Sequence, residues 1–175
     1  IDLDAVAVSS GPGSYTGLRI GTSMAKGICY GRGLKLIGVP TLEILCVPVL
    51  LGKYEIEDNA LLCPMIDARR MEVYAQIFDR ALNTVRPIQA DVVTEETYKE
   101  YLDKGPVYFF GNGAAKCMDT INHPNAHLIS DIEPLAENMF PLAEKRSVAG
   151  KFEDVAYFVP AYLKDFVAKT PKKLL

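Results

Sequence analysis

The chain has 175 residues, of which 49% are hydrophobic and 23% are charged, a composition typical of a packed core rather than of a disordered chain. Its 19 basic and 22 acidic residues give a net charge of −3. This balance argues against a protein that binds nucleic acid over its whole surface, although it leaves room for a local basic patch. No signal peptide or apolar run of about 20 residues is evident, so we expect a cytoplasmic protein without membrane contact.

The first part of the sequence reads as strand, helix, strand and helix. A short apolar strand is expected at 3–9, followed by the turn Gly11-Pro12-Gly13 and a helix at 14–30 that Gly31 and Gly33 would end. A second strand at 34–39 precedes a helix that we expect Thr41 to cap and that runs toward Val47. This order predicts a parallel α/β lobe.

The second part begins after a polar linker at 52–59. Two apolar runs, 61–66 and 72–78, are separated by Asp67-Ala68-Arg69-Arg70 and predict a β-hairpin. Further strands are expected at 88–94, 106–110 and 127–130, with helices from 94, at 117–121 and at 133–149. We therefore predict two related α/β lobes, 1–58 and 59–175, with a C-terminal segment that returns toward the first lobe.

The glycine-rich turn is the first candidate binding element. Gly11 and Gly13 let the backbone approach a neighbour closely, and the hydroxyls of Ser14 and Thr16 join the N–H groups at the start of the helix. Together with Arg19 these groups form a candidate phosphate or cleft site. Tight strand–helix packing around the turn is the alternative, and the sequence leaves both open.

One face of the helix at 14–30 is the second candidate. Gly17, Gly21, Met24, Ala25 and Ile28 are spaced so that they fall on the same side. Glycines destabilise a helix, so this face is expected to make a compensating close contact. The contact is either with a partner protein or with the chain's own sheet.

Metal and nucleophile sites have weak support. Cys29, Cys46, Cys63 and Cys117 form no C-x-x-C pair and are expected to be buried thiols. His123 and His127 have i, i+4 spacing, but Pro124 lies between them, which predicts a loop rather than a metal-binding helix. We predict no metal site and no catalytic residue in this chain.

Several motifs in order carry a family resemblance. The run Gly11-Pro12-Gly13-Ser14-Tyr15-Thr16-Gly17-Leu18-Arg19-Ile20-Gly21 resembles the signature of the TsaB (YeaZ) family, formerly labelled glycoprotease-like. Shorter matches are Ala25-Lys26-Gly27, Gly38-Val39-Pro40-Thr41-Leu42-Glu43, Ile66-Asp67-Ala68-Arg69-Arg70-Met71-Glu72-Val73-Tyr74 and Pro160-Ala161-Tyr162-Leu163. The chain departs from the family pattern at Met71, where many relatives have glycine, and in lacking an N-terminal Asp-Thr-Ser strand.

The resemblance implies an α/β fold of the two-lobed actin-like ATPase (ASKHA, ribonuclease H-like) type, with a first lobe that we expect to be incomplete at its N-terminus. The catalytic paralogue, TsaD, carries a metal-binding His-x-x-x-His. Its two histidine positions fall here on Thr41 and Leu45, which are poor metal ligands.

The resemblance also implies a function, which is that of a non-catalytic scaffold in tRNA threonylcarbamoyladenosine synthesis. Its expected partners are a TsaD-like paralogue, a TsaE-like ATPase and, through the complex, tRNA. ATP or ADP would bind at the complex interface rather than tightly to this chain, and a homodimer is an option for the isolated chain. The tail Lys169, Lys172 and Lys173 is a modest basic cluster that could contact tRNA. The alternative is a metal- or nucleotide-dependent hydrolase that acts in the cleft between the lobes.

Overall fold

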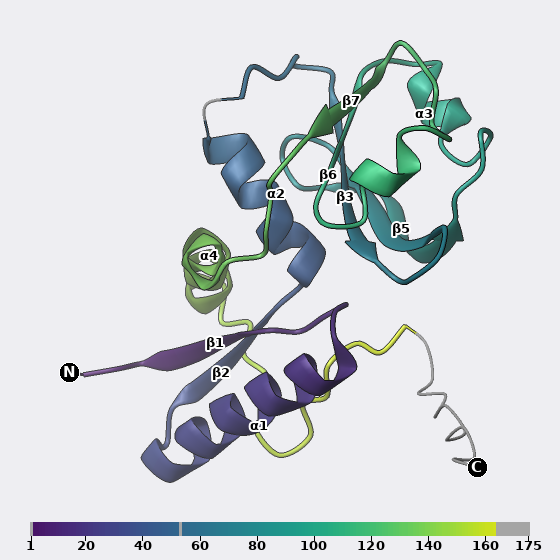
Figure 1. The fold of residues 1–175 in the computed structure, drawn as a ribbon. Helices are drawn as coiled ribbons and strands as arrows, with labels where there is room; N and C mark the ends of the chain where they lie inside the picture. Colours follow the sequence, from purple (N-terminus) through teal and green to yellow (C-terminus); the bar gives the residue numbers. More distant parts are fainter. Residues whose placement is uncertain (1, 53, 164–175) are drawn as a thin grey trace, which may run out of the picture.

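The chain folds around two separate sheets that are linked by one buried helix (Figure 1). The structure is a computed structural model, and it describes residues 2–52 and 54–163. A two-stranded sheet, β1–β2, belongs to the first lobe, and a five-stranded sheet in the order β5-β4-β3-β6-β7 belongs to the second. The tail lysines of the sequence prediction lie outside the described residues.

In the first lobe, β1 (Ala5–Ser9) and β2 (Lys35–Val39) run parallel and are joined by the long helix α1 (Tyr15–Arg32). Ser14 begins this helix, because its side chain accepts a hydrogen bond from the N–H of Gly17. Gly33 ends it in the left-handed conformation, φ 66°. The strand–helix–strand pattern read from the sequence is therefore confirmed to within two residues at each boundary.

Helix α2 (Thr41–Leu51) is buried on two sides and connects the lobes. Leu45 and Cys46 pack toward the large sheet, whereas Ile44 and Val47 pack toward β2 and α4 (Phe140–Val148). A helix that is apolar all round is typical of such a buried position. The prediction that Thr41 caps this helix is wrong, because Pro40 is the N-cap and Thr41 is the first helical residue. Within the described residues no helix is long and apolar enough to cross a bilayer.

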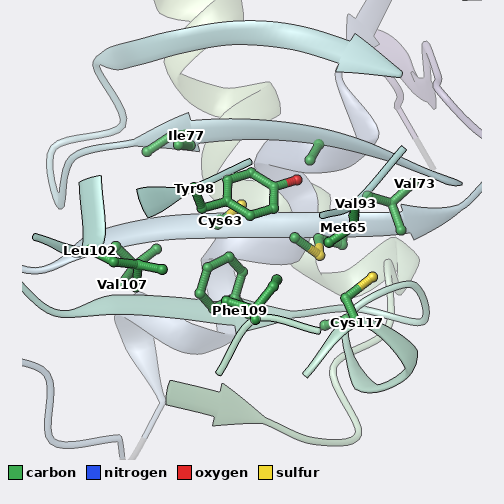
Figure 2. Close-up of a cluster of buried hydrophobic side chains, with 13 residues drawn as sticks. Cys63, Met65, Val73, Ile77, Val93, Tyr98, Leu102, Val107, Phe109 and Cys117 are labelled. Atoms are coloured by element: carbon green, nitrogen blue, oxygen red, sulfur yellow. The ribbon is translucent and has the colours of Figure 1, made fainter. Parts of the chain in front are cut away.

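The second lobe is built on the predicted hairpin. Strands β3 (Leu61–Asp67) and β4 (Glu72–Phe78) are antiparallel, and β5 (Thr84–Val92) continues the meander. Strands β6 (Val107–Phe110) and β7 (Ala126–Ile129) add in parallel on the other side of β3. One face of this sheet holds the cluster in Figure 2, which includes Tyr98 and Phe109, and the other face packs on α2.

Three predicted helices of this lobe are shorter than expected. The helix from residue 94 is reduced to α3 (Lys99–Leu102), because the hydroxyl of Thr97 accepts a hydrogen bond from the N–H of Thr94 and holds a turn there. The helix at 117–121 is a 3-10 turn, η1 (Ala115–Cys117). The helix at 133–149 is divided into η2 (Ala136–Met139) and α4, with Pro141 in the first turn of α4.

All four cysteines are buried free thiols, as the sequence predicts. Burial raises the pKa of each thiol, including that of Cys63, which lies beneath Tyr98 (Figure 2). The same cluster adjoins a buried ion pair, in which Asp91 accepts hydrogen bonds from Arg86 (2.8 Å) and from the Tyr98 hydroxyl (2.7 Å). These hydrogen bonds replace the contacts with water that the Asp91 carboxylate loses when it is buried.

The segment after α4 lies against the first lobe. The N–H of Glu153 donates to the carbonyl of Leu36 at 2.8 Å in an isolated antiparallel bridge to β2. Farther along, the N–H of Ala161 donates to the carbonyl of Ser10 at 2.8 Å. The last described residues therefore complete the packing around the glycine-rich turn.

Candidate functional site

The glycine-rich turn is a close-packing point between three segments. Gly11 has φ +93°, and a Cβ built on it would lie 2.9 Å from the carbonyl oxygen of Ala161. Its own carbonyl accepts the N–H of Thr41 at 2.9 Å, so the turn also contacts the start of α2. Both the left-handed backbone and the lack of space require glycine at this position. Close packing of the turn, one of the two interpretations left open by the sequence, therefore explains why glycine stands at position 11.

The other predicted phosphate-site residues do not converge on one point. The Ser14 hydroxyl oxygen lies 3.3 Å from the N–H of Gly17, which it caps, and Gly13 lies near the side chain of Leu18. Thr16 is exposed on the first turn of α1. Arg19 donates to the Tyr15 hydroxyl at 3.3 Å, with its guanidinium carbon 5.4 Å from that ring's centroid. A phosphate at this turn stays a prediction.

A groove of 390 Å³ runs beside the turn, along the start of α1. It is lined by Val8, Ser9, Pro12, Gly13, Ser14, Gly17, Leu18, Gly21, Thr41 and Pro134. Its polar floor includes Ser9 and Thr41, whose hydroxyl oxygens are 2.6 Å apart. Between the lobes a hollow of only 70 Å³ adjoins Tyr15, Tyr74 and Tyr162.

The positions equivalent to the histidine pair of the catalytic paralogue offer little to a metal. The Thr41 hydroxyl is already bonded to Ser9, and Leu45 is buried in the core between α2 and the large sheet. An alcohol and a hydrocarbon are not the donors that iron or zinc prefers.

His123 precedes β7, whereas His127 lies on this strand, and the two side chains make separate contacts. His123 Nε2 is 3.4 Å from a carboxylate oxygen of Asp103, whereas the His127 ring stacks on Tyr108 with centroids 4.9 Å apart. The prediction that Pro124 interrupts a helical pair is confirmed, since no helix covers these residues. In the part of the chain that the structure describes, no three His, Cys, Asp or Glu side chains gather as a metal site would require.

The predicted partner-binding face of α1 contains both buried and exposed residues in the structure. Ala25 is only 5% exposed and packs with Cys29 and Leu36 in the core of the first lobe, so it is not available to a partner. Met24 and Ile28 are exposed to 64% and 43%, and Gly17 lies at the surface beside them. Gly21 is half-buried, with Val8 of β1 as its neighbour. The prediction that Ala25 belongs to the partner-binding face is therefore wrong.

One member of the outward face was missed in the sequence. Ile20 is 57% exposed and lies one turn before Met24. The same i, i+4 spacing that grouped Gly17 with Gly21 links Ile20, Met24 and Ile28, so the signal was present. We name the surface formed by Gly17, Ile20, Gly21, Met24 and Ile28 the α1 ridge. In Figure 1, α1 lies on the outside of the first lobe, beside β1 and β2.

The tip of the β3–β4 hairpin is held by a residue that the sequence analysis did not include. Asp67 pairs with Lys116, and hydrogen bonding to Lys116 lowers the pKa of this carboxyl. The Asp67 carboxylate also accepts the N–H of Arg69 at 2.9 Å, and the N–H of Glu72 donates to the Arg69 carbonyl at 3.1 Å. Asp67, Arg69 and Glu72 thus form the turn itself, as turn chemistry suggests.

Comparisons with known proteins agree with this geometry. A family model described as "TsaD: tRNA N6-adenosine threonylcarbamoyltransferase" matches residues 1–174. The chain is 31% identical to the tRNA threonylcarbamoyladenosine biosynthesis protein TsaB of Escherichia coli (strain K12), over 98% of this chain and 76% of that protein. It is 34% identical to TsaB of Bacillus subtilis (strain 168), over 63% of this chain and 47% of that protein.

Among solved structures, YeaZ from Pseudomonas aeruginosa has a TM-score of 0.72 and 22% identity, over 92% of this chain and 74% of that one. A second Pseudomonas aeruginosa structure, described as an uncharacterized protein with similarity to peptidase YEAZ, has a TM-score of 0.79 and 21% identity, over 93% and 74%. The fold is therefore that of two-lobed α/β proteins of the actin-like ATPase class. Within this class, the chain belongs to the TsaB (YeaZ) family.

Proposed function

We propose that this chain is a non-catalytic subunit for the synthesis of threonylcarbamoyladenosine in tRNA, and that it docks through the α1 ridge on a TsaD-like catalytic partner. A TsaE-like ATPase would bind at their junction, where ATP or ADP would also bind. The tRNA reaches the chain through the assembled complex. The proposal takes the pathway from the names of the relatives in Escherichia coli and Bacillus subtilis.

The single observation that carries the docking surface is the exposure of large apolar side chains on α1. Ile20, Met24 and Ile28 are exposed to 57%, 64% and 43% although the helix has a complete buried side of its own. Contiguous exposed apolar side chains mark interaction surfaces in soluble proteins. Gly17, two turns before Met24, is exposed and lets another helix approach the backbone closely, whereas Gly21 is half-buried beside Val8 at the edge of the ridge.

The fold of the proposed partner supports the pairing. The family model that matches residues 1–174 is named for the catalytic enzyme, so we expect a TsaD-like protein to have a helix equivalent to α1. Two related subunits can pair through equivalent helices around a pseudo-two-fold axis. A homodimer through the same ridge is the outcome expected when the paralogue is absent.

The non-catalytic role is supported by the donor set at the paralogue's metal position. Thr41 is engaged with Ser9 and Leu45 is in the core, so the chain has no side chain there to activate a carbamoyl donor. In this proposal the chain stabilises and orients the catalyst, and bond chemistry takes place in the partner.

A charge placed on the ridge tests the proposal. Met24→Lys would bury an unpaired ammonium at the interface, which costs several kcal/mol and lowers affinity by about 100-fold or more. Val148→Lys is the matched control, because Val148 is an exposed apolar residue on α4, away from the ridge. Both variants would be measured by calorimetric titration with the TsaD-like protein and by threonylcarbamoyl transfer to tRNA. Equal affinities for the two variants would contradict docking through the ridge.

A further inference from the structure

The turn between β3 and β4 has an unusual backbone. Arg69 and Arg70 both have positive φ, 77° and 50°, and both side chains are exposed. Glycine, asparagine and aspartate are the residues that normally occupy left-handed turn positions, because other side chains are strained there. Two successive arginines therefore have no backbone advantage at this turn. Strained residues that persist in a well-supported turn point to a use for their side chains.

The turn is supported from below by Lys116. Its ammonium donates to the carbonyls of Arg70 (2.6 Å) and Glu72 (2.8 Å) and pairs with the carboxylate of Asp67. These contacts fix the backbone on both sides of the arginines. A fixed backbone reduces the conformational freedom that the turn would lose when a ligand binds.

The local charge is positive in a chain whose net charge is −3. Of the two acidic residues at the turn, Asp67 and Glu72, Asp67 is bonded to Lys116, and Arg69 makes a smaller contribution to the lowered pKa of the Asp67 carboxyl. Within the described residues, neither guanidinium of the turn has a hydrogen-bonded side-chain partner. Two arginine forks are therefore available to an anion, and this side chain matches phosphate oxygens in a bidentate geometry.

We propose that Arg69 and Arg70 bind the phosphodiester backbone of RNA when the tRNA substrate approaches this lobe. The proposal rests on the proposed function, which supplies RNA as the polyanion, and it adds a contact made by this chain itself. Tyr74, four residues beyond Arg70 on β4, lines the hollow between the lobes together with Pro12. Contacts of this kind position a nucleic acid and carry no sequence preference.

The test replaces the arginines without disturbing the turn. Arg69→Asn with Arg70→Gly keeps residues that favour positive φ, so we expect the thermal unfolding midpoint not to fall. Arg80→Ala with Lys104→Ala is the control, because it removes the same formal charge from the same lobe at two ion-paired positions. Fluorescence anisotropy would report binding of each full-length protein to a labelled RNA stem–loop across a salt series.

Loss of two phosphate contacts should reduce the slope of log K against log salt by about 1.4 to 1.8. We expect that reduction for the turn variant and a smaller change for the control. Equal slopes for the two double variants, or no RNA binding by the wild-type chain, would overturn the proposal. So would a variant that loses binding to poly-glutamate but not to RNA, since the arginines would then serve an acidic protein. Met24→Lys leaves this slope unchanged, which separates failure of ridge docking from failure of the RNA contact.

Discussion

Gly27 offers a sharp test of the structural account of α1. It lies in the interior of the helix, and a Cβ built on it would meet nothing within 4 Å apart from its chain neighbours and local helix backbone. Gly27→Ala therefore introduces no steric conflict in the isolated chain. The substitution changes only the intrinsic preference for helix and the freedom of the unfolded chain.

The expected gain follows from these terms. Glycine in a helix interior is about 0.8–1.0 kcal/mol less favourable than alanine, so Gly27→Ala should stabilise the folded chain by about that amount. For a domain of this size the thermal midpoint should rise by about 2–4 °C. Urea unfolding followed by circular dichroism would measure the free energy of unfolding, and Gly113→Ala is the control. A Cβ on Gly113 would lie 2.9 Å from the backbone nitrogen of Asp67 and 2.9 Å from the backbone carbonyl carbon of Ile66, so that variant should lose stability.

A loss of stability for Gly27→Ala would refute this reasoning. It would mean that the outer side of α1 is occupied in the chain as it exists in solution, for example by a second copy. Repeating the urea unfolding over a range of protein concentrations shows whether a second copy covers the helix, because only for a self-associating chain would the free energy of unfolding depend on protein concentration.

Three further predictions concern the interior. Gly11→Ala should cost about 2 kcal/mol or more in urea unfolding, since it adds left-handed strain to the contact with Ala161; an unchanged midpoint would contradict the geometry of the turn. Arg86→Met should destabilise by about 3–5 kcal/mol, because it leaves the buried Asp91 carboxylate without its cation; a neutral effect would show that the pair is dispensable. The buried thiols predict alkaline destabilisation. Burial raises the pKa of each thiol in the folded state above the unfolded value of about 8.5. The thiols therefore contribute their full share of folding stability below that pH. Above it the unfolded chain loses thiol protons first, and the free energy of unfolding falls by up to about 1.4 kcal/mol per pH unit for each thiol. A urea midpoint that increases from pH 8 to pH 10 would contradict this sign.

Local signals in the sequence were sufficient to predict β1, α1, β2 and the β3–β4 hairpin. Ser14 and Gly33 are chemically suited to the two ends of α1, and the turn residues 67–70 separate two apolar runs clearly. The helices of the second lobe were overestimated because their ends depend on tertiary contacts and local side-chain bonds, such as that between Thr94 and Thr97. Short polar segments of this kind have weak intrinsic preferences.

The candidate site was only partly accessible from the sequence, for two physical reasons. Both sides of α1 carry apolar residues, so spacing alone could not show that Ala25 faces the core while Ile20 faces outward. The support of the hairpin tip by Lys116 joins residues far apart in the chain, and no local pattern indicates such a contact. The orientation of α1 and the support from Lys116 both depend on tertiary packing, which only the structure shows.

Thiol footprinting of the α1 ridge tests the central claim most directly. The four native cysteines are buried, so a thiol introduced by Met24→Cys is expected to react selectively with a water-soluble maleimide, and Val148→Cys provides an exposed reference away from the α1 ridge. We predict that a saturating TsaD-like partner slows labelling at position 24 and leaves labelling at position 148 unchanged. A labelling rate at position 24 that stays unchanged when the partner is added would contradict the claim that this helix is the docking surface.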